Sequence, residues 1–106
     1  MNDNTLLHAK LNLETAPIAW TELQRFFATG VVFRVDNSID MVEVAVHISN
    51  DDRAKVEQLL SSGQLARVSD EFALKWFETD ATLWSVVVKP WILVQEMPVD
   101  TQKTVQ

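Results

Sequence analysis

The chain has 106 residues, of which 47% are apolar and 23% charged, and this is the composition of one globular domain rather than of a disordered or repetitive chain. Its formal net charge of −6 is carried entirely by residues 36–80, which hold ten acidic and four basic side chains, and this disfavours nucleic acids and membrane surfaces as partners because both are anionic. The chain contains no cysteine, which excludes disulfides, thiolate nucleophiles and cysteine-bound metals.

The N-terminal part of the chain predicts two helices. Residues 4–15 form the first helix, which ends before Pro17 because proline cannot continue the hydrogen-bonding pattern. Residues 21–29 form the second helix, in which Thr21 and Gln24 match a capping box. A glycine directly after this segment favours a helix end there.

The chain then changes to strand chemistry. Residues 31–35 are rich in valine and phenylalanine and predict a strand. A polar turn over residues 36–40 follows, and the alternation of residues 41–48 predicts the next strand. In such a strand Glu43 and His47 would lie on the same, more polar face.

The next part predicts two more helices separated by a short strand. The third helix begins at Ser49 or Asn50 and is closed by Gly63. Residues 64–68 suit a short strand, and Ser69 caps a fourth helix. One face of that helix is expected to lie in the core, and it consists of Phe72, Ala73, Trp76 and Phe77.

The most apolar segment, residues 84–95, is rich in β-branched side chains. We expect one long strand bent or bulged near Pro90, because proline cannot adopt the positive φ of a two-residue hairpin turn; two short strands are the alternative. Residues 98–106 have little to bury and are expected to fray. Together the segments predict an α+β domain over residues 1–97, with a small, mostly antiparallel sheet of three or four strands and about four helices packed on it.

The chain resembles a known family in four segments, which read LNLETAPIAWTELQRFFATGVV, DMVEVAV, SDEFALKW and LWSVVVKPWILVQE. The family is a group of small bacterial proteins known as domain of unknown function 2288. The similarity covers residues 6–96, and its most specific part is the closing string that contains Trp91. The resemblance implies a bacterial, cytoplasmic, single-domain protein, and it brings no activity, cofactor or partner with it.

Glu43 and His47 form the pair with the clearest chemistry on a predicted strand. A carboxylate beside an imidazole can act as a general base or supply half of a metal site, and Asp40 and Asp36 would lie nearby. The chain has no HExxH, GxSxG or phosphate-loop motif, and His8 belongs to no ligand spacing. We therefore interpret the pair as solvent-facing and predict no catalytic, cofactor-binding or metal-binding residue.

The chain has four tryptophans and no tyrosine. Filling of the core is the expected role for most of them, and an interface or a small-molecule pocket is the alternative. The four residues are Trp20, Trp76, Trp84 and Trp91.

The last predicted strand indicates an interaction surface. If its alternation continues through the proline, Val87, Trp91 and Leu93 share one face, opposite a second apolar face. A strand that is apolar on both sides needs cover on both, and an edge strand tolerates Pro90. We therefore expect the face with these three residues to form a two-fold homodimer.

No motif assigns an activity. The N-terminal residues do not resemble a secretory signal and no apolar run approaches the length of a membrane span, so we expect a cytoplasmic protein. The leading hypothesis is a non-enzymatic protein-interaction or regulatory domain of unknown partner. The alternatives are a small metal-dependent enzyme that uses the face with Glu43 and His47, and a small-ligand sensor with a tryptophan-lined pocket.

Overall fold

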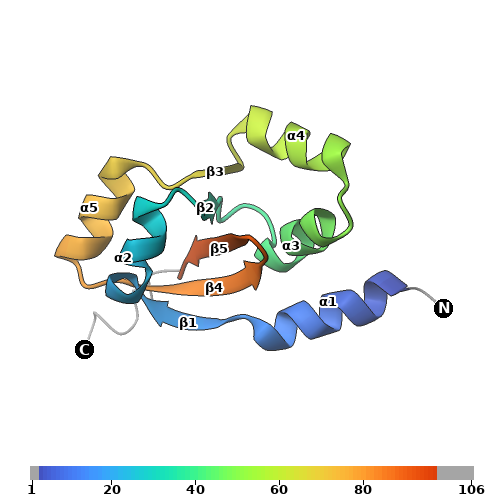
Figure 1. Cartoon of the computed structure of the whole chain (residues 1–106), viewed down its shortest axis with the longest axis horizontal. Helices are drawn as coiled ribbons and strands as arrows, with labels where there is room; N and C mark the ends of the chain where they lie inside the picture. Colours follow the sequence, from blue (N-terminus) through green and yellow to red (C-terminus); the bar gives the residue numbers. More distant parts are fainter. Residues whose placement is uncertain (1–2, 98–106) are drawn as a thin grey trace.

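A five-stranded sheet with helices on both faces forms the protein (Figure 1). The computed structural model describes residues 3–97, so the expected fraying of residues 98–106 lies outside the described residues. The elements follow one another as α1 (Asp3–Glu14), β1 (Ala16–Ala19), α2 (Trp20–Ala28), β2 (Val32–Val35), α3 (Met41–Ser49), α4 (Arg53–Ser62), β3 (Leu65–Arg67), α5 (Asp70–Glu78), β4 (Thr82–Val88) and β5 (Trp91–Glu96). The α+β class is as predicted, but the described residues form five helices and five strands, which is more of each than expected.

The strands lie in the order β1-β4-β5-β2-β3. Three of the four pairings are antiparallel, whereas β2 and β5 run parallel with Val32 beside Ile92, so the sheet is mixed. Strand β5 lies in the middle, and β1 and β3 are the edges. Strand β1 was not predicted, because a four-residue edge strand that contains Pro17 has too little periodicity to be recognised.

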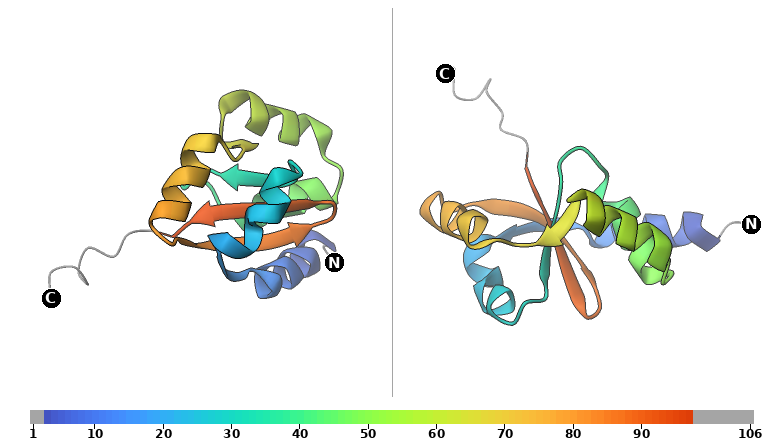
Figure 2. Two further views of the ribbon diagram at one scale, coloured as in Figure 1. Left: turned by 60° about the vertical axis from the view of Figure 1, so that its left-hand side comes forward. Right: turned by 90° about the horizontal axis from the view of Figure 1, so that it is seen from above.

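Each face of the sheet carries its own hydrophobic core, since side chains alternate along each strand. Helices α1, α3 and α4 cover one face, and α2 and α5 cover the other (Figure 2, right). We call the first the α3 face, and its buried strand residues are Val35, Leu65, Val86, Val88 and Leu93. We call the second the α5 face, and its buried strand residues are Val32, Leu83, Ile92 and Val94.

Residues 41–48, predicted as a strand, belong to helix α3. Asp40 begins the helix, because its carboxylate accepts a hydrogen bond from the Val42 backbone N–H at 2.9 Å. The segment is apolar at so many positions that it matches the strand and helix periods alike. The buried side chains of the helix are Met41, Val42, Val44, Ala45 and Val46. Burial against the sheet therefore overrides the weak strand preference of the valines.

Residues 84–95, predicted as one bent strand, lie in two strands that form an antiparallel hairpin, β4 and β5. Lys89 and Pro90 form the turn, and the peptide bond between them is cis. Neither residue of this turn has a positive φ. The prediction of one long bent strand assumed that a hairpin turn here requires a positive φ, and that prediction is wrong.

Two predicted helix signals act as expected. Ser69 caps α5, since its hydroxyl accepts a hydrogen bond from the Phe72 N–H at 3.2 Å. Gly63 ends α4 with a φ of 81°, a conformation that glycine adopts without steric cost.

Two other helix starts differ from the prediction. Helix α4 is capped by Asp52 and not by Ser49 or Asn50, which lie at the end of α3 and directly after it. The capping box predicted for α2 is absent, because the N-cap of that helix is Ala19, which has no side-chain cap hydrogen bond. The motif requires Thr21 at the N-cap, but β1 leads directly into the helix and the N-cap lies two residues earlier.

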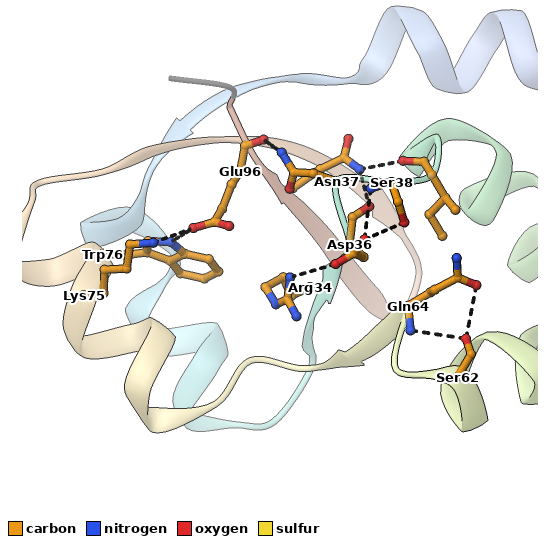
Figure 3. A network of polar contacts seen from close by, with 11 residues as sticks. Arg34, Asp36, Asn37, Ser38, Ser62, Gln64, Lys75, Trp76 and Glu96 are labelled. Carbon is orange, nitrogen blue, oxygen red and sulfur yellow. Dashed lines mark hydrogen bonds and ion pairs between the residues drawn. The ribbon is translucent and has the colours of Figure 1, made fainter. Parts of the chain in front are cut away.

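The loop between β2 and α3 is tied to the end of β5 (Figure 3). The Gln95 amide donates to the backbone carbonyls of Asp36 at 2.9 Å and of Ile39 at 2.7 Å. The Asn37 amide donates to the backbone carbonyl of Glu96 at 2.9 Å. These bonds fix where α3 begins relative to the centre of the sheet.

The carboxylate of Asp36 folds this loop back on itself. It accepts hydrogen bonds from the hydroxyl of Ser38 and from the backbone N–H of Ser38 at 3.0 Å, and Arg34 lies 3.9 Å away. The bonds from Ser38 hold the pKa of the Asp36 carboxyl below its ordinary value, and the Arg34 charge contributes less.

Two buried tryptophans pack edge-to-face at the centre of the α5 face. The ring centroids of Trp20 and Trp76 lie 5.1 Å apart, and their exposed fractions are 1% and 2%. The expected core position of Trp76 is confirmed, although Phe77 on the same helix is 56% exposed. The Trp76 indole N–H donates to Glu96 at 3.0 Å, whereas the Trp20 N–H has no hydrogen-bond partner among the residues that the structure describes.

Because the indole N–H of Trp76, but not that of Trp20, is hydrogen-bonded among the described residues, we expect replacement by phenylalanine to reduce stability by different amounts at the two positions. Both changes should lower the free energy of unfolding, and the loss should be about 1–2 kcal/mol smaller for Trp20→Phe than for Trp76→Phe. The reason is that Trp76→Phe breaks a hydrogen bond, whereas Trp20→Phe removes an unsatisfied donor. Chemical denaturation of both variants measures the difference. Since the two changes remove the same atoms, each serves as the other's control; an equal or greater loss for Trp20→Phe would contradict the assignment.

Ser38→Ala is expected to raise the pKa of Asp36 toward its ordinary value of 3.8, since one of the bonds that favour the carboxylate is lost. A carboxyl with a depressed folded-state pKa adds stability above the unfolded value, and that stability disappears as the pH falls through the lower folded value. The variant should therefore be less stable than the wild type at pH 7. The difference in stability should shrink as the pH falls below the ordinary pKa of the carboxyl. NMR titration of the side-chain carboxyl measures the shift, and an unchanged pKa would refute it.

Candidate functional site

An open apolar pocket lies on the α3 face, between helix α4 and the tip of the β4–β5 hairpin. Its volume is about 320 Å³. We call it the Trp91 pocket, and its apolar lining consists of Phe33, Ile48, Val56, Leu60, Leu65, Trp91 and Leu93. Leu60 is 45% exposed, so the α4 side of the pocket is open to solvent.

Two aromatic rings build one wall of the Trp91 pocket. The rings of Phe33 and Trp91 meet edge-to-face, with centroids 5.3 Å apart and an interplanar angle of 84°. The Arg67 guanidinium lies 5.8 Å from the Phe33 ring centroid. Trp91 is half-buried, and its ring packs against Phe33 at the pocket surface.

Charged side chains surround the apolar lining. Asp51, Asp52 and Glu57 are acidic and Arg53 and Lys89 are basic, so the rim carries a net charge of 2 − 3 = −1. Arg53 lies 3.5 Å from Asp51, and Asp52 caps α4. Within residues 3–97, Glu57 and Lys89 have no ion pair, which leaves both charges available at the rim.

The three residues of the expected interface do not share a face. The turn of the hairpin places Val87 opposite Ile92, on the α5 face, whereas Trp91 and Leu93 belong to the α3 face. Leu93 is 0% exposed and cannot reach a partner. Because β5 lies in the middle of the sheet, the edge-strand argument from Pro90 is also wrong. Trp91 and Leu93 line the Trp91 pocket, and of these two only Trp91 is partly exposed.

Glu43 and His47 lie one turn apart on α3 rather than on the face of a strand. Together with His8 of α1 they line a shallow hollow of about 230 Å³. The Nδ1 atom of His47 lies 3.2 Å from a carboxylate oxygen of Asp52. Asp36 does not join this group, since its carboxylate is bonded within its own loop.

The structure brings His8 into a cluster that the sequence does not reveal. One possible ligand atom from each of His8, Asp40 and Glu43 lies within 4.8 Å of the other two. Leu7 and Leu11 of α1 pack against the core beneath α3, and this contact places His8 beside the start of that helix. Because His8 lies on α1, far along the chain from Asp40 and Glu43, no spacing motif could indicate its contact with them.

The remaining candidates are placed less favourably. Trp84 is 38% exposed on β4, and Trp20 and Trp76 fill the core of the α5 face. Among residues 3–97, no helix has the length and apolar character needed to cross a membrane.

Comparisons with known proteins place this chain in a family. The chain is 46% identical to a protein whose structure is described as the NMR solution structure of PA1075 from Pseudomonas aeruginosa, with a TM-score of 0.78 over 93% of this chain and 92% of the other. A comparison with curated proteins found no match. The family model described as "Protein of unknown function (DUF2288)" matches residues 6–96, as the sequence resemblance predicted, and the chain belongs to this family.

Proposed function

We propose that this chain is a non-enzymatic, cytoplasmic protein-interaction domain, and that the Trp91 pocket receives one large apolar side chain of a partner segment with basic flanking residues. The observation that carries the proposal is the open apolar pocket with a half-buried tryptophan in its wall. Partly exposed aromatic residues in well-packed pockets are typical anchors of protein interfaces.

The size and chemistry of the Trp91 pocket favour a side chain over a substrate. Its volume of about 320 Å³ is at the lower end of the range of about 300–1,000 Å³ that is usual for small-molecule sites. Seven of its twelve lining residues are apolar, and the lining contains no histidine, serine or threonine. These features support binding rather than catalysis.

Charge supports a basic partner. Residues 36–80, which carry the whole net charge of −6, form α3, α4 and α5 and include most of the pocket rim. Glu57 lies at the rim without an ion pair among the described residues, so a lysine or arginine beside the anchoring side chain would find a partner there. The acidic field would also speed the approach of such a segment.

Selection from a library of random peptides tests this proposal. Immobilised wild-type protein should enrich peptides that share one large apolar residue next to lysine or arginine. Leu60→Glu, which places a charge at the pocket opening, should lower peptide affinity at least tenfold, a loss of about 1.4 kcal/mol. Leu74→Glu is the matched control, since Leu74 is also exposed, at 57%, but lies on α5 outside the pocket.

The outcomes separate the possible occupants. Equal binding by wild type and Leu60→Glu, or enrichment of acidic peptides, would refute the proposal. Sedimentation velocity at micromolar concentration measures self-association, which the sequence analysis predicts. A dimer mass that falls to the monomer mass in Leu60→Glu but not in Leu74→Glu would put a second copy in the pocket and overturn the proposed occupant. A small molecule retained in native mass spectrometry would favour the sensor alternative instead.

A further inference from the structure

We infer that His8, Asp40 and Glu43 form a binding site for a divalent transition-metal ion, separate from the Trp91 pocket. The site lies where α1 crosses the N-terminal turn of α3. It contains one imidazole nitrogen and two carboxylate oxygens, a donor set that zinc and related ions accept in proteins.

The distances suit a shared ion better than direct pairing. The His8 Nε2 atom lies 3.9 Å from the Asp40 Oδ2 atom, which is too long for a hydrogen bond. Donors around a tetrahedral zinc ion, at about 2.0–2.2 Å from the metal, lie about 3.3–3.6 Å from one another. The three donors already lie within 4.8 Å of one another, so rotations of the His8 and Glu43 side chains toward Asp40 are the movements that bonding to one ion requires.

A hydrogen bond from the backbone positions the side chain of Asp40 as a ligand. Its Oδ1 atom accepts the hydrogen bond from the Val42 N–H that caps α3, so its side chain has a fixed position. The other oxygen, Oδ2, is the one closest to His8. The capping bond thus orders one ligand before any ion arrives, which lowers the entropy lost on binding.

The space and the charge around His8, Asp40 and Glu43 suit a cation. His8 and Glu43, but not Asp40, line the hollow of about 230 Å³, which leaves room beside these two ligands for water as further ligands. No lysine or arginine lines the hollow, so its carboxylate charge is not neutralised by a basic side chain. His47 also lines the hollow, but among the described residues it does not join the group of donors that lie within 4.8 Å of one another, and we assign it no bond to the metal.

The chain offers conservative variants for each ligand. Asp40→Asn keeps a capping oxygen but removes the charge, and Glu43→Gln keeps the size of the side chain. His8→Gln removes the imidazole from a residue whose side chain is 43% exposed, so folding should persist and circular dichroism can verify it. His47→Gln is the matched control, because it removes the other histidine of the chain from the same hollow.

Calorimetric titration of the purified protein with zinc chloride tests the site. We expect saturable binding of one ion, weakened at least about tenfold by His8→Gln, Asp40→Asn or Glu43→Gln and by less than threefold by His47→Gln. Magnesium chloride should bind at least tenfold more weakly, since magnesium disfavours imidazole ligands. Zinc should also raise the melting temperature of the wild type but not that of His8→Gln.

NMR of the two imidazole rings distinguishes the ligands directly. Zinc should shift the ring signals of His8 and leave those of His47 in place. Absence of saturable one-to-one binding, unchanged affinity in His8→Gln, or loss of binding in His47→Gln equal to that in His8→Gln would each overturn the assigned site. None of these readouts depends on the Trp91 pocket, so this inference and the proposed function fail independently.

Discussion

Strand β5 is hydrogen-bonded to β4 on one side and to β2 on the other, and both hydrophobic cores are built on its two faces. Leu93 on the α3 face and Val94 on the α5 face are each 0% exposed. A strand covered on both sides is apolar at nearly every position, which explains its unbroken run of apolar residues. The edge strands β1 and β3 join the sheet only through the neighbours of β5, so its placement decides the rest of the sheet.

The polar end of the same strand positions the helices. Gln95 binds the loop that leads into α3, and Glu96 accepts hydrogen bonds from Lys75 and Trp76 of α5. One strand end thus anchors a helix on each face of the sheet (Figure 3). Because buried or partly buried polar groups must be paired, these bonds also favour this arrangement over a shifted register.

Helix α3 connects the two candidate sites. Its first turn supplies Asp40 and Glu43 to the cluster with His8, and the residues that follow its last turn form part of the rim of the Trp91 pocket. If residues 41–48 were a strand, as the alternation suggests, neither site would exist. The interpretation of function therefore depends on one element whose sequence matches two periods equally well.

Four features could be predicted from the sequence: the α+β class, the family, the capped start of α5 at Ser69 and the core role of Trp76. They follow from local capping, amphipathic spacing and family-specific sequence segments. Three other features emerge only in the folded chain: residues 41–48 are helical, the chain reverses at Pro90, and His8 lies close to Glu43. Each of these depends on burial or contact between distant segments. Local propensity differs by only about 1 kcal/mol per residue, and packing against the sheet outweighs it.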